Sequence, residues 1–443
     1  MCRRRTILNI SVTETYDTDV LYLATQGDGA VLTPDGNKAY IPQTLAGERV
    51  RLTKNADGKW QLAQVLQPSP NRQTPPCTLF ERCGGCTLQH IKPATILQWK
   101  KATVQHALQK AGFTNLPACS AQQVQQHTRR RADLAVRRQP DGIIIGLHAR
   151  NSSTVTDLTS CIVLHPDIMK ALSAFRATLR SLNAIRREAN LHINLLDSGL
   201  DVLLQTDGPL TAPDRVRLAQ LATDQHIPRI SWQLIKDTGL PEVAAQSGSV
   251  YQTIASHQIT PPPGTFLQAT GESEIYIQEA VIKSLPAKLN RRDIITELYA
   301  GCGTFTFPLA ERARVNAYEG YAPALDALKK ASGGTRINAF CRDLNHQPVL
   351  AKEIAASAVV VLDPPHAGAK LQMRQIAQGQ PTHIIYVSCN PAALAQDASL
   401  LAKAGYTVEN VTVVDQFLWS TEIEAVCSFK RESSRRNRNG LSR

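Results

Sequence analysis

The start of the chain alternates apolar and polar residues in short runs. Strand-like segments at Val31-Leu32, Ala39–Ile41 and Glu48–Leu52 are separated by turn signals such as Gly-Asp-Gly and Pro-Asp-Gly-Asn. Several short strands at this spacing are typical of a small barrel. We therefore predict an N-terminal β-barrel over residues 7–67.

The middle of the chain has a mixed pattern. A loop region rich in Pro, Cys and Gly (68–93) precedes a segment that predicts a helix from Thr95 to Ala111. Strands and helices then mix up to the breaker Pro261–Gly264, which indicates a domain boundary. The pattern predicts a central α+β domain over residues 68–265.

Apolar strands alternate with helices from about residue 266. Helices are expected at Ile275–Leu285 and Pro323–Ala331. The expected strands are Asp293–Tyr299, Arg314–Glu319, Ile337–Cys341, Ala358–Asp363 and a segment from His383. This alternation predicts a multidomain α/β protein whose C-terminal domain (266–431) is a doubly wound, mainly parallel sheet, followed by a basic tail (432–443).

The composition narrows the class of protein. With 43% apolar and 19% charged residues among 443, the chain is globular rather than disordered. It has no apolar run of about 18 residues and no signal-peptide pattern, so we expect a cytoplasmic protein without a membrane span.

The net charge of +12 favours an anionic partner such as nucleic acid. Residues 1–5 and 430–443 carry eight of these charges. The cluster Arg129–Arg131 lies on a strand-like stretch and faces either solvent or RNA.

Three cysteines, Cys77, Cys83 and Cys86, lie within ten residues, and two of them flank Gly-Gly. Disulfides are not expected in a cytoplasmic chain of this length. Thiolates at this spacing can bind one soft metal centre, with Cys161 as the fourth ligand by counting. The site is then zinc or an iron–sulfur cluster, and spacing does not separate the two. The alternative is a tight loop of reduced structural cysteines.

A cofactor site is expected where the first C-terminal strand ends in Gly301-Cys-Gly303, because ligands bind beyond the carboxyl ends of such strands. Glu319 ends the next strand and can accept hydrogen bonds from both ribose hydroxyls. A third glycine is missing, which argues against a pyrophosphate and hence against NAD. S-adenosylmethionine fits better, and the alternative is a glycine turn in an unrelated α/β domain.

Cys389 ends an apolar strand, and Asn390-Pro391 stops that strand directly after it. With Asp363 at the end of a neighbouring strand, the thiol is a candidate nucleophile; the alternative is a buried packing cysteine. Thiolate addition to C6 of a pyrimidine makes C5 nucleophilic, and a base must later remove the C5 proton. Glu422 and Glu424 are expected on one face of the last strand and supply carboxylates, unless both are merely solvated.

These motifs in this order resemble the S-adenosylmethionine-dependent RNA uracil-C5 methyltransferases, most closely the iron–sulfur group acting on 23S ribosomal RNA. The resemblance covers residues 7–431 and implies an RNA-binding TRAM barrel, a class I methyltransferase domain and an RNA partner. It also implies that Cys77, Cys83, Cys86 and Cys161 bind a [4Fe–4S] cluster.

The resemblance assigns roles residue by residue. Cys389 is the nucleophile and Glu424 the proton acceptor. The cofactor-binding residues are Gln268, Tyr299, Gly301, Gly303, Glu319, Asp343 and Asp363. The sequence departs from the family pattern at His366, Glu422, Thr270 and Thr304. A second carboxylate at Glu422, two residues before Glu424, would raise the pKa of one of these two glutamates.

We expect a monomeric enzyme that methylates a uridine in ribosomal RNA. Three alternatives remain at the level of sequence. They are a transfer RNA uridine methyltransferase, an RNA-binding assembly factor of impaired activity, and a DNA cytosine C5 methylase.

Overall fold

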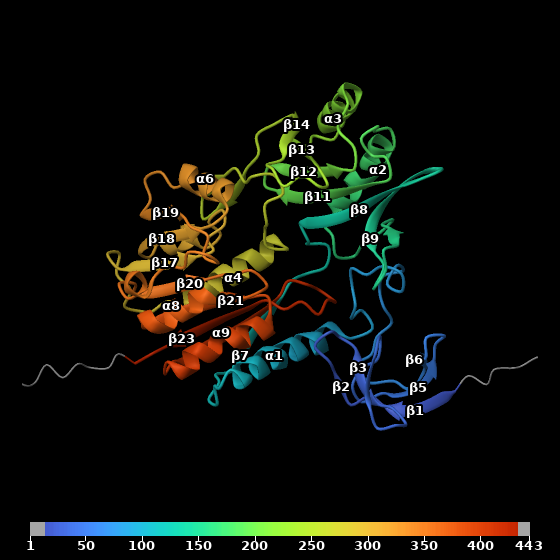
Figure 1. Ribbon diagram of the computed structural model, residues 1–443, viewed down its shortest axis with the longest axis horizontal. Helices are drawn as coiled ribbons and strands as arrows, with labels where there is room; N and C mark the ends of the chain where they lie inside the picture. Colours follow the sequence, from blue (N-terminus) through green and yellow to red (C-terminus); the bar gives the residue numbers. More distant parts are fainter. Residues whose placement is uncertain (1–13, 433–443) are drawn as a thin grey trace, which may run out of the picture. The chain divides into compact units, whose positions relative to one another are not determined.

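The computed structural model describes residues 14–432 (Figure 1). Residues 7–13 of the expected barrel, the N-terminal arginines and nearly all of the basic tail lie outside the described residues. The described chain forms two compact units. One contains the residues up to Phe80, Cys86–Ile96 and Trp419–Thr421, and the other contains Glu81–Gly85, Leu97–Leu418 and the residues from Glu422 onward.

The N-terminal unit holds six short strands. They are β1 (Thr15–Asp19), β2 (Tyr22–Leu23), β3 (Gly29–Leu32), β4 (Lys38–Ile41), β5 (Arg49–Lys54) and β6 (Trp60–Gln67). Two antiparallel sheets, β1-β5-β6 and β2-β3-β4, share one core that includes Val31, Ile41 and Leu52. The predicted strands are confirmed. Within the described residues no strand ladder joins the two sheets, so the closed barrel stays a prediction.

An eight-stranded mixed sheet organises the C-terminal part of the chain. Its strands are β7 (Cys119–Gln123), β17 (Ile294–Leu298), β18 (Arg314–Glu319), β19 (Ile337–Cys341), β20 (Val359–Leu362), β21 (His383–Ser388), β22 (Thr407–Asp415) and β23 (Ala425–Lys430). Their order is β19-β18-β17-β20-β21-β23-β22-β7. The first five run parallel, and β23 is antiparallel to both of its neighbours.

Helices cover both faces of this sheet (Figure 1). On one face lie α1 (Pro93–Lys110), α8 (Leu371–Gly379) and α9 (Pro391–Lys403). On the other face lie α4 (Gly271–Lys283), α5 (Thr306–Ala310) and α6 (Ala322–Ala331). Every residue of β20 is fully buried because both of its faces are covered, which is why this strand is continuously apolar. The doubly wound sheet predicted from the alternation is confirmed.

A seven-stranded sheet is built from the middle of the chain, in the order β10-β9-β8-β11-β12-β13-β14. The bounds are β8 (Arg131–Gln139), β9 (Gly142–His148), β10 (Val155–Asp157), β11 (Glu188–Leu196), β12 (Gly199–Thr206), β13 (Arg229–Leu234) and β14 (Glu242–Gln246). Helices α2 (Pro166–Arg180) and α3 (Ala212–Asp224) pack against it. Ala132, Leu134 and Val136 of β8 are buried, as their alternation predicts.

Three short elements complete the described chain. The hairpin β15 (Gln252–Ile254) and β16 (His257–Ile259) follows the seven-stranded sheet, and helix α7 (Ala351–Ile354) precedes β20. No helix of the described part of the chain is long and apolar enough to cross a membrane.

Two segments differ from the sequence expectation. β7 lies within the range expected for the central domain, yet it pairs in parallel with β22 at the edge of the C-terminal sheet. Glu422 and Glu424 precede β23 instead of lying on one face of it; Glu422 is exposed and Glu424 is buried. The domain boundaries themselves stay a prediction.

Candidate active site

Four parallel strands end level at one edge of the C-terminal sheet. Leu298 of β17 pairs with Tyr318 of β18 and with Leu362 of β20, and Leu362 pairs with Tyr386 of β21. The register therefore brings the residues that follow these positions to the same edge. Tyr299, Glu319 and Asp363, expected from the sequence to bind the cofactor, are among them.

The loop after β17 has the backbone form that its glycines allow. Gly301 and Gly303 both have positive φ, at 55° and 102°. A Cβ at Gly301 would meet nothing within 4 Å, so open space lies beside that residue. A Cβ at Gly303 would come within 2.7 Å of Leu328 in α6, so Gly303 is required for packing.

The Glu319 carboxylate is held by backbone donors. It accepts one hydrogen bond from the Gly301 N–H (2.8 Å) and one from the Tyr321 N–H (2.7 Å). The carboxylate is thereby fixed at the open space beside Gly301, with lone pairs left for further donors.

Glu297 is a buried acid that the sequence reading did not single out. It lies on β17 and is 1% exposed, and neither carboxylate oxygen has a hydrogen-bond partner within the described residues. Burial raises its pKa to about 8; the Thr306 hydroxyl opposes this rise, and the nearby Asp363 and Glu319 carboxylates contribute to it. Its signal in the sequence is a charged residue inside the apolar run Ile294-Ile-Thr-Glu-Leu.

Tyr299 and Asp343 are placed differently from each other. Tyr299 has a positive φ of 65°, which strains a non-glycine residue, and its buried hydroxyl has no partner within the described residues. Asp343 is exposed and hydrogen-bonded to His346 (2.7 Å). It still adjoins the site, because a Cβ on Gly320 would lie 3.3 Å from the Asp343 Cα.

Cys389 lies between the end of β21 and the start of α9 and is half-buried. Asn390 caps α9 through its side-chain oxygen, and its amide nitrogen donates to the His366 carbonyl (2.9 Å). The hydrogen bond that joins the Cys389–Asn390 segment to the Asp363–His366 loop is therefore accepted by a backbone carbonyl. The departure from arginine at His366 leaves this contact in place.

The register of β21 and β23 brings Cys389 opposite Glu424. Ser388 pairs with Ala425 in antiparallel register, so the next residue of one strand faces the preceding residue of the other. Glu424 is 4% exposed; its Oε2 accepts from Gln416 (2.8 Å), and its Oε1 has no partner within the described residues. Thus the structure brings together the two residues expected to carry the chemistry.

Burial and charge set the protonation of this pair. Burial, together with the charges of the Glu424 and Asp363 carboxylates, raises the pKa of the Cys389 thiol to about 12. Burial raises the pKa of Asp363 to about 7. Burial and the Asp363 charge also raise the pKa of Glu424 well above its ordinary value, while the Gln416 hydrogen bond opposes the rise.

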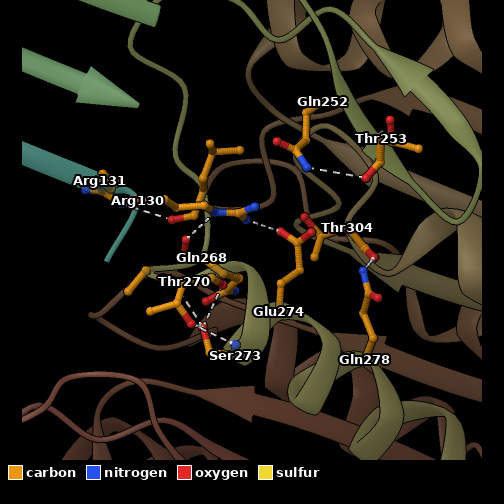
Figure 2. Close-up of polar contacts among 12 residues, drawn as sticks. Arg130, Arg131, Gln252, Thr253, Gln268, Thr270, Ser273, Glu274, Gln278 and Thr304 are labelled. Carbon is orange, nitrogen blue, oxygen red and sulfur yellow. Dashed lines mark hydrogen bonds and ion pairs between the residues drawn. The ribbon is translucent and has the colours of Figure 1, made fainter. Parts of the chain in front are cut away.

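Gln268 is held from two sides. Its side-chain oxygen accepts from Gln416 (2.9 Å). Its backbone carbonyl accepts from Arg130 Nε (3.2 Å), as Figure 2 shows. Arg130 is buried and forms an ion pair with Glu274 of α4 at 2.6 Å. Arg130 therefore supports the backbone at Gln268, and the expectation that it faces either solvent or RNA is wrong.

The neighbouring arginines also contact the protein itself. Arg131 lies over the Phe266 ring at 4.6 Å from its centroid, and Arg129 donates to the Arg131 carbonyl. Arg130 and Gln416 could not be identified by pattern, because neither a buried arginine nor a single glutamine has a sequence signature.

The four expected metal ligands are all half-buried. Cys161 Sγ accepts from the N–H groups of Val163 and Leu164, and Cys83 Sγ accepts from the Gly85 N–H, each at 3.4 Å. Among residues 14–432, however, no group of three or more His, Cys, Asp or Glu side chains is placed to hold a metal ion. The expected cluster is not supported by the structure.

The Gly-Gly pair between Cys83 and Cys86 has a packing explanation. Gly84 donates to the His148 carbonyl of β9 (2.9 Å), and a Cβ on Gly84 would lie 2.5 Å from that oxygen. A Cβ on Gly85 would meet Leu147 at 2.6 Å. Gly84 is needed for the close approach of this loop to the β9 backbone, so it has a packing explanation without a bulky ligand.

Comparison with known families gives one match. The family model described as tRNA (Uracil-5-)-methyltransferase matches residues 345–432. This segment includes Cys389, Gln416 and Glu424.

Relatives match over nearly the whole chain. An uncharacterized RNA methyltransferase of Mesorhizobium japonicum is 36% identical over 94% of this chain and 98% of its own length. The 23S rRNA (uracil(1939)-C(5))-methyltransferase RlmD of Chromohalobacter salexigens is 29% identical over 93% of this chain and 89% of its own.

The fold matches a solved structure. The Pyrococcus abyssi tRNA (uracil-54, C5)-methyltransferase, crystallised with S-adenosyl-L-homocysteine, superimposes with a TM-score of 0.68. The alignment covers 94% of this chain and all of that one at 18% identity, so it supports the fold alone.

Proposed function

Because the chain belongs to the RNA uracil-C5 methyltransferase family, we propose that it transfers a methyl group from S-adenosylmethionine to C5 of a uridine in RNA. The observation that carries the proposal is the register of β21 and β23, which sets Cys389 opposite the buried Glu424. A thiol and a carboxylate facing each other at the ligand-binding edge of the sheet match the two roles that the reaction needs.

The edge of the sheet fits S-adenosylmethionine in shape and charge. The open space beside Gly301 admits a ligand, and Glu319 is oriented to accept the ribose hydroxyls. The cofactor carries positive charge, and the buried Glu297 carboxylate beside Asp363 has no donor of its own within the described residues. A cationic ligand would compensate the burial of these acids.

The proposed reaction begins with the thiol. The Cys389 thiol gives its proton to solvent, and the thiolate sulfur bonds to C6 of the uracil while the C5–C6 π electrons move to C5. Bound S-adenosylmethionine supplies the methyl group, which C5 takes from the sulfonium sulfur. A positive charge beside Cys389 would also lower the pKa of the thiol, so cofactor binding favours the first step.

Release needs a base. One Glu424 oxygen takes the C5 proton, and the electron pair of the C–H bond re-forms the C5–C6 double bond as the Cys389 sulfur leaves. The buried Glu424 Oε1, which has no partner within the described residues, is the candidate acceptor. The target base must leave its stack to reach these groups.

The test uses labelled S-adenosylmethionine and uridine-containing RNA. We expect 5-methyluridine with the wild-type chain, no label with Cys389→Ala, and with Glu424→Gln an RNA–protein adduct that does not resolve. Cys341→Ala is the matched control, because Cys341 is exposed and ends β19. Undiminished labelling by Cys389→Ala would overturn the mechanism.

We propose 23S ribosomal RNA as the substrate, with transfer RNA as the alternative. The relative from Chromohalobacter salexigens supports ribosomal RNA, and the transfer RNA enzyme supports only the fold at its 18% identity. Mapping 5-methyluridine in both RNA pools of a strain that lacks the gene separates the two. A missing modification in transfer RNA alone would reject the ribosomal substrate.

An iron–sulfur cluster on Cys77, Cys83, Cys86 and Cys161 is a separate proposal. Its support is the cysteine spacing and the backbone N–H donors to Cys83 and Cys161, since such donors stabilise a thiolate. We expect iron and acid-labile sulfide in protein purified without oxygen, and loss of both in Cys161→Ser but not in Cys341→Ser. Zinc without iron, or no metal in the wild type, would reject the cluster.

A further inference from the structure

The Gln416 side chain joins the two halves of the site. It directly follows β22 and is 1% exposed. Its amide nitrogen donates to Gln268 Oε1 (2.9 Å) and to Glu424 Oε2 (2.8 Å). Its amide oxygen accepts from the Ala269 N–H and from the Ser273 hydroxyl, each at 2.9 Å.

These contacts fix which end of the amide faces Glu424. A backbone N–H can only donate, so the group that faces Ala269 must be the oxygen of Gln416. The nitrogen then points to Glu424, and its two protons are divided between Glu424 and Gln268. Each of the four hydrogen-bonding positions of the Gln416 side chain has a partner within reach, and the Ser273 hydroxyl shares its proton with the Thr270 carbonyl.

The position of Gln416 is itself anchored by a buried ion pair. The preceding residue, Asp415, binds Lys100 of α1 at 2.6 Å, and both side chains are fully buried. Gln123 of β7 donates to the other Asp415 oxygen (2.8 Å). The end of β22 is therefore held rigidly, and Gln416 with it.

Within the described residues Gln416 is the one side chain that donates to the Glu424 carboxylate. It engages Oε2 and leaves Oε1 buried without a partner. Oε2 of Glu424 is thus held by Gln416, and Oε1 remains available to accept a proton.

Resting on the proposed function, we propose that Gln416 is a positioning residue. It holds Glu424 by Oε2 so that Oε1 receives the C5 proton of the methylated uridine. The same amide nitrogen also holds the Gln268 side chain by a hydrogen bond. This role goes beyond the nucleophile and the base, because Gln416 itself touches neither the thiol nor the reacting carbon in the proposed reaction.

The charged groups around Glu424 define the expected pH effect. Asp363 after β20 and Glu422 on the same segment both oppose its ionisation, and Cys389 faces it from β21. Beyond Gln416, Lys100 is paired with Asp415. Gln416 supplies the hydrogen bond that favours the ionised form, so its loss should make Glu424 a carboxylate only at higher pH.

The first test is the variant Gln416→Met, which keeps the volume and removes the amide. We expect slow proton removal, so an RNA–protein adduct that requires S-adenosylmethionine and Cys389 should accumulate at neutral pH and resolve as the pH rises. Turnover should fall at least about tenfold, with the pH optimum about 1 to 2 pH units higher. Ser273→Ala, which removes one partner of the Gln416 oxygen, should change turnover in the same direction by less.

The matched control is Gln372→Met. Gln372 is also fully buried with both amide ends hydrogen-bonded, but to Val349, away from the site. We expect a loss of stability without an adduct. If Gln416→Met behaves like Gln372→Met and leaves no excess adduct, Gln416 is merely structural and the inference fails.

A readout without RNA separates this inference from the proposed function. In protein labelled with ¹³C at the glutamate carboxyls, the Glu424 signal is identified by its loss in Glu424→Gln. We expect it to titrate at higher pH in Gln416→Met than in the wild type. An unchanged titration overturns the inference even if methylation proceeds, whereas a wild type that makes no 5-methyluridine overturns the proposed function whatever the titration shows.

Discussion

At the scale of single residues, a raised pKa keeps Cys389, the proposed nucleophile, as a thiol in the free protein. Cys389 is half-buried near Asp363 and Glu424, two carboxyl groups whose pKa values are raised. The pKa of the Cys389 thiol is about 12. A thiol protected in this way reacts little with solvent electrophiles. We therefore expect the positive charge of bound S-adenosylmethionine to favour ionisation of this thiol.

Alkylation of Cys389 tests this expectation. We expect the rate of modification by iodoacetamide at pH 8 to rise when a saturating S-adenosylmethionine analogue with the sulfonium charge is present, because a nearby cation lowers the pKa of the thiol. S-adenosylhomocysteine, which lacks that charge, is the matched ligand. Site-resolved mass spectrometry separates Cys389 from the exposed Cys341. Equal rates with both ligands would contradict the prediction.

Glu297 makes a prediction about stability. Its pKa is about 8 in the folded protein and 4.5 when unperturbed, so the folded state binds more protons between these values. Stability due to this group therefore falls as the pH rises from about 4.5 to 8 and levels off above. Glu297→Gln should remove that fall and stabilise the protein at pH 8.5 by up to roughly 5 kcal/mol, with little effect near pH 4.5.

Denaturant unfolding at the two pH values measures this difference. Glu279→Gln, on the exposed side of α4, is the control and should change neither value. The measured quantity is the difference in unfolding free energy between Glu297→Gln and the wild type. If this difference is the same at pH 8.5 as near pH 4.5, Glu297 is not a buried acid of raised pKa.

At the scale of elements, two buried ion pairs between strands and helices hold the site. Arg130, directly before β8, binds Glu274 of α4, and its backbone N–H donates to the Ala269 carbonyl (2.9 Å). Lys100 of α1 binds Asp415 at the end of β22. Gln416 directly follows Asp415 in the chain, and the Gln268 carbonyl accepts a hydrogen bond from Arg130. The site therefore depends on packing between elements far apart in the sequence.

Arg130→Met tests the first ion pair. It leaves Glu274 buried and uncompensated and releases the Gln268 carbonyl, so we expect a loss of about 3 to 5 kcal/mol in stability and weaker S-adenosylmethionine binding. Arg229→Met is the matched control. Arg229 forms a buried bidentate pair with Asp201 between β12 and β13, outside the site. It should lose similar stability but keep cofactor affinity in calorimetric titration; equal losses of affinity would refute the role of Arg130.

At the scale of the whole molecule, the excess of positive charge lies mostly at the two ends of the sequence. The described arginines at 129–131 are engaged with the protein, so they add little to an RNA-binding surface. We infer that non-specific RNA affinity comes largely from the terminal arginines, whereas the choice of uridine comes from the site.

Removal of residues 433–443 tests this division. The segment contains four arginines, so the slope of log affinity against log salt should become shallower by about 3 for single-stranded RNA. The modified position should stay the same. A full-length variant with these arginines changed to glutamine should match the truncation; an unchanged slope in both would show that the terminal charges do not contact RNA.

The sequence by itself determined the alternating strands and helices, the glycine turn after β17 and the identity of Cys389 and Glu424 as candidates. These features are local: periodicity follows from burial on one or two faces, and a glycine turn follows from backbone sterics. The sequence also predicted that the arginine cluster faces solvent or RNA, and there the local pattern misled, because Arg130 is buried against Glu274. In the cysteine loop Gly84 allows close packing on β9, and the metal cluster stays a proposal.

Only the tertiary structure decided which groups meet. The antiparallel register of β21 and β23 sets Cys389 against Glu424, and it makes Glu424 buried while Glu422 is exposed. The tertiary structure also showed that Glu297 and Gln416 belong to the site, because burial and hydrogen-bond partners depend on residues far apart in the sequence. A carboxylate becomes a base of suitable pKa through desolvation and a donor from another strand, and no single segment of sequence contains that information.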